Sequence, residues 1–281
     1  MSEEFYEIVK DENEMKWFFD HIISKPEAYE SYMVCLSARS KKLTSEERAV
    51  YQLGRGEMMR TEIIRSKGGD WNFNIYKQGP YKYNCNKNAM LTKTGLPYPE
   101  KCLVCYAYVN PSDELKCVND TMEFSNKVHQ ELIESFRKNS KEGVVDNFSK
   151  VAKISEHLRS CHATNLSRRI WRDIDIDLKA EYKEDDAIRS NVEKILKERF
   201  TATFGKGNFA IIKTSGGYHC LLRVETIKTD LKAFCEGLDM TLENLTDEIK
   251  ITEAGSQFVP LPGTLQYGKL VTIVNKEDFD V

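Results

Sequence analysis

The sequence predicts an α+β protein whose second half forms an antiparallel sheet backed by two helices. Strand-length segments of branched and alternating side chains, together with helix-length segments that carry apolar residues three and four apart, indicate mixed secondary structure. After residue 170 these segments follow one another as strand, helix, strand, strand, helix and strand. That order is typical of a split βαβ unit.

The N-terminal part mixes apolar helix with several strands. One helix is predicted over 12–24, and another begins after Thr44, because Glu47 stands three residues later at the spacing of a capping box. Strands are predicted over 32–37, 58–64, 71–76 and 102–109. The last of them ends at Asn110-Pro111, since proline cannot continue a ladder of backbone hydrogen bonds.

Two helices, predicted over 121–137 and 144–160, connect this part to the split βαβ unit. The unit then comprises strand 170–178, helix 185–200, strands 208–213 and 218–225, and helix 229–238, followed by late strands near 249–252, 257–260 and 270–274. Four of these strands would form the antiparallel sheet, with both helices on one face.

Charge and hydropathy exclude several classes of protein. The net charge of −3 excludes a polycation that binds nucleic acid indiscriminately, so such binding would need local basic clusters. No apolar run approaches the roughly 20 residues that cross a bilayer, and the N-terminus lacks the layout of a signal peptide. We expect a protein of the bacterial, archaeal or viral-host cytoplasm with no membrane partner.

The eight cysteines are scattered, which is typical of reduced thiols. Cys102 and Cys105 have C-x-x-C spacing, but on the predicted strand 102–109 an odd separation would send them to opposite faces. His157 and Cys161, four apart on a predicted helix, could form at most half of a metal site, and no second half has matching spacing. We therefore expect no structural zinc.

The segment Ile170–Leu178 carries the strongest indication of chemistry. On a strand its aliphatic side chains point one way, while Asp173, Asp175 and Asp177 point the other way at intervals of about 7 Å. Such a row of like charges is unfavourable unless a cation neutralises it, and Mg²⁺ or Mn²⁺ prefers carboxylate oxygens. The alternative is an edge strand that carries acids for solubility. We favour the metal site.

A glycine-rich hairpin follows, with a histidine at the start of its second strand. Two glycines let a backbone turn sharply and approach a phosphate closely. Candidate ligands of a nucleotide's phosphates are Lys213, His219 and the backbone amides at Gly216 and Gly217. The alternative is a plain β-hairpin with a satisfied histidine.

A proline-containing turn over 258–268 lies near the end of the chain. Its prolines forbid a central strand, so we expect a rigid loop between short strands. Glu253, just upstream, could bring a further carboxylate to the aspartates, and Asp247 and Glu248 are rivals for that role.

Together these stretches resemble the archaeo-eukaryotic primase superfamily, particularly the primase-polymerases of viruses, plasmids and mobile elements. Ile174-Asp-Ile-Asp177 is similar to the hydrophobic-Asp-hydrophobic-Asp strand of that family, and Ser215-Gly-Gly-Tyr-His219 is similar to its small-x-His motif. Leu261-Pro-Gly-Thr264 looks like the turn after the family's third acid, although Pro260 stands where many members have arginine.

The N-terminal part contributes two further points of resemblance. Ala38-Arg-Ser-Lys41 after one strand and Asn110-Pro111 after another look like features of the family's N-terminal module. The resemblance implies an RRM-like catalytic module over 112–281, packed on an N-terminal α/β module over 1–111 that contacts template and nucleotide.

The resemblance also implies an activity, namely template-directed nucleotidyl transfer by a DNA primase, a DNA polymerase or both. Two Mg²⁺ or Mn²⁺ ions would serve the reaction. Asp175, Asp177 and Glu253 would hold the ions, with Asp173 able to replace Asp177 because the register is open. The nucleotide's phosphates would contact His219, Lys213 and Ser215, and the template or nucleotide would contact Arg39, Lys41 and Arg60.

The implied partners are a single-stranded DNA template, a primer and nucleoside triphosphates. The sequence has no Walker A motif, so a replicative helicase would be a separate partner. A nucleotidyl cyclase or an end-joining gap filler would use the same sheet and metals. The non-enzymatic alternative is an inactive RRM-like module that binds single-stranded nucleic acid or a replication protein, and exposed aromatic residues on the sheet would favour it.

Overall fold

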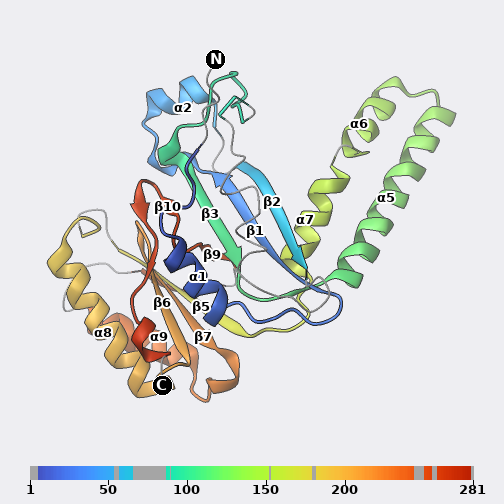
Figure 1. Cartoon of the computed structure of the whole chain (residues 1–281). Helices are drawn as coiled ribbons and strands as arrows, with labels where there is room; N and C mark the ends of the chain where they lie inside the picture. The colour runs from blue at the N-terminus through green and yellow to red at the C-terminus, as the bar shows by residue number, and fades with distance from the viewer. Residues whose placement is uncertain are drawn as a thin grey trace.

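Two antiparallel sheets and a short helix between them organise the chain (Figure 1). The computed structural model describes residues 6–53, 57–65, 87–88, 90–151, 153–178, 182–243, 250–254 and 258–279. The mixture of helices and antiparallel sheets confirms the predicted α+β class. The predicted strand over 71–76 lies outside the described residues.

The five-stranded sheet contains the predicted split βαβ unit. Its strands, in spatial order, are β12 (Thr272–Ile273), β6 (Phe209–Lys213), β7 (Gly217–Arg223), β5 (Trp171–Asp177) and β8 (Lys250–Ala254). All neighbouring strands are antiparallel. The prediction of four antiparallel strands is confirmed, and β12 adds a fifth strand at the β6 edge.

Two helices cover one face of this sheet, α8 (Asp186–Phe204) and α9 (Leu231–Glu243). The buried side chains of α8 recur every four residues and so form one stripe, and Ile174 and Ile176 of β5 belong to the same core. That stripe consists of Val192, Leu196, Phe200 and Phe204. The alternation of β5 therefore sends its isoleucines toward the helices and its aspartates to the other face.

The seven-stranded sheet draws its strands from both ends of the chain. Its main path runs through β11 (Lys269–Leu270), β10 (Leu265–Gln266), β3 (Leu103–Tyr108), β1 (Glu30–Ala38) and β2 (Glu57–Arg65), while β4 (Ser112–Asp113) pairs with β1 and β9 (Phe258–Pro260) pairs with β3. Residues beyond the predicted boundary at 111/112 thus complete the N-terminal sheet. The two predicted modules share one sheet and, through it, one core.

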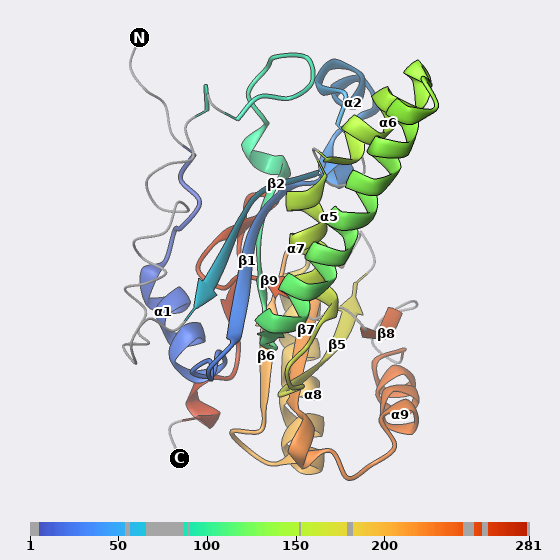
Figure 2. The same ribbon diagram turned by 90° about the vertical axis from the view of Figure 1, so that its right-hand side faces the viewer.

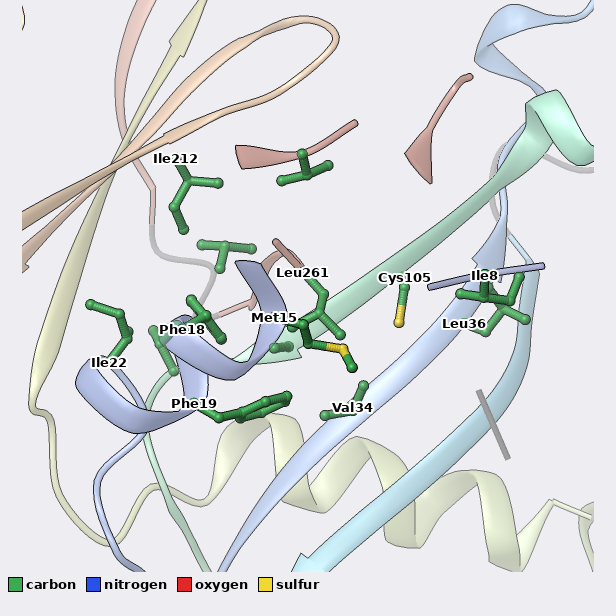
Figure 3. Close-up of a cluster of buried hydrophobic side chains, with 14 of the residues drawn as sticks. Ile8, Met15, Phe18, Phe19, Ile22, Val34, Leu36, Cys105, Ile212 and Leu261 are labelled. Atoms are coloured by element: carbon green, nitrogen blue, oxygen red, sulfur yellow. The ribbon is translucent and has the colours of Figure 1, made fainter. Parts of the chain in front are cut away.

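Helix α1 (Glu12–His21) fills the space between the sheets. Figure 3 shows its Phe18 and Phe19 between Ile212 of β6 and Val34 of β1, and all four side chains belong to one buried cluster. This packing explains why the predicted helix over 12–24 is so apolar for its length. It also fixes one sheet against the other, because the same helix is buried by both.

The Leu261-Pro-Gly-Thr264 turn holds the start of α1. The Gly263 carbonyl accepts hydrogen bonds from the amides of Lys10 and Asp11, at 2.8 and 3.0 Å. Gly263 has a φ of 84°, and a Cβ atom there would lie 2.2 Å from the Asp11 carbonyl oxygen, so only glycine fits.

Asn110 fixes the start of the aspartate strand. Its buried side-chain oxygen accepts from the amides of Ile170 and Trp171, at 2.7 and 2.8 Å, and its Nδ2 donates to the Trp171 carbonyl at 2.9 Å. The Trp171 indole in turn donates to the Ile22 carbonyl at 2.8 Å, beyond the end of α1. Asn110, which follows β3 of the seven-stranded sheet, thus anchors the start of β5 in the five-stranded sheet.

The helices α5 (Glu114–Arg137), α6 (Lys141–Val151) and α7 (Ile154–Thr164) project from the sheets (Figure 1). Figure 2 shows them on the opposite side of the seven-stranded sheet from α1. The prediction of one helix over 144–160 is wrong, because the chain turns between α6 and α7, where the Lys153 amide donates to the Lys150 carbonyl. The predicted capping box at Thr44 is confirmed at the start of α2 (Ser45–Tyr51).

The expected separation of Cys102 and Cys105 is wrong. Cys102 lies in a 3₁₀ turn (Glu100–Cys102) and the strand begins only at Leu103, so alternation along a strand does not apply to the pair. Both thiols are buried in the same apolar cluster, and burial raises the pKa of Cys102 to about 11. Among the described helices, none is both long and apolar enough to cross a membrane.

The buried carboxylate of Glu30 binds the segment that leads into β5, and this contact can be tested by mutation. It accepts hydrogen bonds from Ser167 Oγ at 2.6 Å and from Arg168 Nε at 3.0 Å, and also from the Glu27 amide. Burial alone would raise the pKa of Glu30, but these hydrogen bonds and the Arg168 charge outweigh it and lower the pKa. Ionised Glu30 therefore stabilises the folded state above its unfolded pKa, and this stabilisation is lost as the pH falls through the lowered folded value.

We predict that Glu30→Gln reduces the free energy of unfolding at pH 7 by about 1.5–3 kcal/mol, the range for hydrogen bonds to charged groups. The difference from the wild type should shrink as the pH falls below about 4.3, the ordinary pKa of glutamate. Urea denaturation at a series of pH values measures it. The matched control is Glu27→Gln, whose exposed side chain also pairs with Arg168 and should change stability by less than about 1 kcal/mol. A pH-independent loss in Glu30→Gln would contradict the assignment.

Candidate active site

Strand β5 carries three aspartates on one face, and β7 carries a histidine among them. Asp173, Asp175 and Asp177 alternate with the buried isoleucines, as the sequence predicts. In the antiparallel register Asp175 is directly opposite His219, so both side chains stand on the same face. We call this face, which is opposite to α8 and α9, the aspartate face.

His219 lies between two of the carboxylates. Its Nδ1 is 2.9 Å from Asp173 Oδ2, a hydrogen bond, whereas its Nε2 is 3.8 Å from Asp175 Oδ1, which is too long for one. The exposed fraction of these side chains is 1% for Asp173, 14% for His219 and 36% for Asp175. The aspartate face is therefore closed at Asp173 and open at Asp175.

Burial and neighbouring charges together shift the pKa values of two of these groups. Burial raises the pKa of Asp175, His219 opposes the shift, and the charges of Asp177 and Asp173 raise the pKa further. For His219, burial would lower the pKa, but the charge and hydrogen bond of Asp173 and the charge of Asp175 outweigh it and raise the pKa. Burial is thus the largest cause of the shift at Asp175, whereas the neighbouring carboxylates raise the pKa of His219 against its burial, and negative charge contributes to both shifts.

Asp177 ends β5 beside the hairpin that joins β6 to β7. Its Oδ1 lies 3.5 Å from the position that a Cβ atom would occupy at Gly216, and Lys183 Nζ lies 4.0 Å from the same position. A carboxylate and an ammonium group therefore both border the backbone at Gly216.

Two basic residues predicted for this site, Arg39 and Lys41, follow strand β1. Arg39 Nη1 donates to the hydroxyl of Tyr106 at 2.7 Å. Burial would lower the pKa of Arg39, but Tyr106 and, more weakly, Asp177 raise it, so the guanidinium lies within electrostatic reach of Asp177. Lys41 is exposed and opposes the rise in the pKa of Asp175. The structure thus brings both basic residues near the aspartates.

The backbone amides of the hairpin already have partners within the protein. The amides of Gly216 and Gly217 donate to Thr214 Oγ1, at 3.3 and 3.2 Å. The amide and hydroxyl of Ser215 both donate to Gln266 Oε1, at 2.9 and 3.0 Å. The groups predicted to hold phosphates at Ser215, Gly216 and Gly217 therefore close the hairpin and tie it to the seven-stranded sheet.

Gly217 is required by packing. A Cβ atom at Gly217 would lie 1.8 Å from the carbonyl oxygen of Ile176 on the neighbouring strand β5. The hairpin needs glycine here because it approaches the aspartate strand at backbone distance, which is a different reason from the predicted approach to a phosphate.

Two predicted ligands are not brought to the aspartate face. Lys213 points toward α8, where its Nζ pairs with Glu193 at 2.7 Å on the side of the sheet that the helices cover. Glu253 is paired in register with Ile174, whereas Thr252 is opposite Asp175, so Glu253 occupies a position of the isoleucine face. The side chain of Glu253 lies outside the described part of the structure.

Three further predicted residues fall outside what the structure describes. Asp247 and Glu248 are not among the described residues, and the side chain of Arg60 on β2 is not described. Their roles stay predictions.

Sequence reasoning missed two residues at this site. Tyr106 lies in an apolar strand far from the aspartates in sequence, and no motif marks it. Gln266 belongs to the segment after the Leu-Pro-Gly-Thr turn, and only its pairing in β10 carries it to Ser215. Each residue places a polar group in a strand whose other residues are mostly apolar. That contrast was the one feature of the sequence that could have marked them as functional.

The donor set of the aspartate face fits a hard divalent cation. Within the described residues, no group of three or more His, Cys, Asp or Glu side chains could hold a metal ion. Mg²⁺ is commonly bound through only one or two carboxylates, with waters and substrate phosphates as the other ligands. Asp175 and Asp177 offer two carboxylates of this kind, and Asp173, whose Oδ1 is buried without a donor among the described residues, is less accessible.

Comparison with protein-family models found no matching family, and comparisons with curated proteins and with solved structures found no similar chain.

We predict that Gly217→Ala destabilises the protein by about 1–3 kcal/mol or more, because the added methyl group meets the Ile176 carbonyl. The matched control is Gly237→Ala in α9, where a Cβ atom would meet nothing within 4 Å. That substitution should stabilise the protein by about 0.5–1 kcal/mol, the helical preference for alanine. The midpoints of thermal unfolding of the two variants measure the difference. Equal midpoints in Gly217→Ala and Gly237→Ala would show that β5 and β7 are not packed in this way.

Proposed function

We propose that this protein is a template-directed nucleotidyltransferase, a DNA primase or DNA polymerase or both, and that the aspartate face is its active site. The observation that carries the proposal is the pairing of Asp175 with His219 on an open part of that face. Arg39 and Lys41 supply positive charge from the segment that follows β1. The order of these groups in the sequence is also that of the primase superfamily which the chain resembles.

Each group has a distinct part in this proposal. Asp175 and Asp177 would hold Mg²⁺ or Mn²⁺, which, when bound, neutralises the triphosphate and lowers the pKa of the attacking hydroxyl. His219, with Nε2 toward the open part of the face, would donate a hydrogen bond to a phosphate oxygen of the nucleotide. Arg39 and Lys41 would attract the phosphates of nucleotide or template, in a manner that weakens with salt.

The non-enzymatic alternative is less well supported. An RRM-type module that binds single strands stacks bases on exposed aromatic rings of its sheet. On the aspartate face, the one Phe, Tyr or Trp ring within the described strands is that of Trp171, which is buried and bonded to the chain after α1. Without a cation, the aspartates would also repel a nucleic-acid backbone.

The assignment predicts that Asp175→Ala combined with Asp177→Ala reduces primer extension by about 10³-fold or more, as expected when residues that act as one unit are removed. A primed template, nucleoside triphosphates and Mg²⁺ or Mn²⁺ make the assay, and omission of the primer tests priming with each nucleotide type. Glu198→Ala on the exposed side of α8 is the control and should leave extension unchanged. Extension at the wild-type rate by the double variant would refute the proposed function.

For His219→Ala we expect the KM for the nucleotide to rise by about 10-fold or more, because a hydrogen bond to a charged phosphate is lost. The affinity for Mn²⁺, measured by electron paramagnetic resonance without nucleotide, should change by less than about threefold. Unchanged nucleotide KM in this variant would remove His219 from the binding site.

A further inference from the structure

We propose that Asp173 is a positioning residue, which holds the imidazole of His219 so that Nε2 is presented on the open part of the aspartate face, and that it is not a metal ligand. This inference rests on the proposed function for its consequences on catalysis. It goes beyond the sequence-based expectation, in which Asp173 could replace Asp177 as a metal ligand because the register was open.

Burial separates Asp173 from the other aspartates. Its side chain is almost completely enclosed, and in the β5–β7 register it is opposite Leu221, a fully buried residue of the cluster around α1. A divalent cation that keeps several waters needs an open side, which Asp175 has and Asp173 lacks. The carboxylate of Asp173 is therefore placed for contact with the protein, not with a hydrated ion.

The hydrogen bond to His219 fixes one proton of the ring. A carboxylate without a proton has acceptors only, so under this proposal the Nδ1 of His219 is the donor to Asp173 Oδ2 across the 2.9 Å between them. The ring plane and the identity of the exposed nitrogen follow from this bond. The nitrogen that remains toward Asp175 and the open face is Nε2.

A purely structural role explains Asp173 less well. Its Oδ1 is buried and meets no hydrogen-bond donor among the described residues, so the carboxylate is only half satisfied. Opposite the apolar Leu221, an aliphatic side chain would avoid this cost. What an aliphatic residue would lose is the bond to His219.

The first test compares Asp173→Asn with Asp175→Asn, a substitution two residues away on the same face. We expect Asp173→Asn to raise the nucleotide KM by about 10-fold or more, with a smaller effect on kcat and less than about a twofold change in Mn²⁺ affinity. Asp175→Asn should instead weaken Mn²⁺ binding by about 10-fold or more. Equal losses of Mn²⁺ affinity in the two variants would make Asp173 a ligand and overturn the proposal.

A double-mutant cycle tests whether Asp173 acts through His219. In a His219→Ala background, Asp173→Asn should cause no further rise in the nucleotide KM, because the group it positions is gone. Effects that multiply in the double variant would show that Asp173 acts independently, which overturns the proposal.

A readout without activity separates this inference from the proposed function. Long-range ¹H–¹⁵N correlation spectra of the wild-type protein report which ring nitrogens of His219 carry protons, and we expect Nδ1 to be protonated and to lose its hydrogen-bonded shift in Asp173→Asn. An unprotonated Nδ1 in the wild type overturns the inference, even if no variant folds. If the wild type extends no primer while Nδ1 is protonated and bonded, the proposed function fails and the positioning by Asp173 stands.

Discussion

The burial of α1 between two sheets is the interaction on which the remaining structure depends. One helix shares its apolar surface with both sheets, so their relative position is fixed by a single core, with Phe18 and Phe19 near its centre. The Leu-Pro-Gly-Thr turn holds the first turn of that helix, and the Trp171 indole holds the chain beyond its last turn. Without α1 between the sheets, Arg39 and Lys41, which follow β1 of the seven-stranded sheet, would not be held near the aspartates of the five-stranded sheet.

The core around the same helix helps to make Asp173 different from Asp175. Along one face of β5, Trp171 is covered by the chain after α1, Asp173 is enclosed and Asp175 is open. Chemically identical groups at equal spacing thus meet a gradient from apolar core to solvent within about 13 Å of strand. At the buried end of this face, a carboxylate is favoured when it binds another side chain. At the exposed end, a carboxylate can exchange its water for a cation.

The serine and glycines of the hairpin between β6 and β7 can be explained in two ways, by phosphate binding or by the packing of the hairpin itself. Its serine and glycines look like a cradle for phosphate, but their amides bond to Thr214 and Gln266, and Gly217 makes room for the Ile176 carbonyl. The hairpin contributes to the site by carrying His219 into register with Asp175. Its chemistry therefore lies in the strand that follows the glycines, and the glycines allow that strand to approach β5.

Local periodicity was enough to predict the split βαβ sheet, its two covering helices and the common face of Asp173, Asp175 and Asp177, because strand alternation and helix stripes are properties of neighbouring residues. Strand alternation also determines on which side of the sheet Lys213 lies. Its ion pair with Glu193, however, depends on how α8 packs on that side. The register of β8, which puts Thr252 instead of Glu253 opposite Asp175, depends on loop geometry that no local pattern encodes. The contacts of Tyr106, Gln266 and Arg39, and the burial that distinguishes Asp173 from Asp175, arise only when distant strands pack around α1, since they are made between residues far apart in the chain.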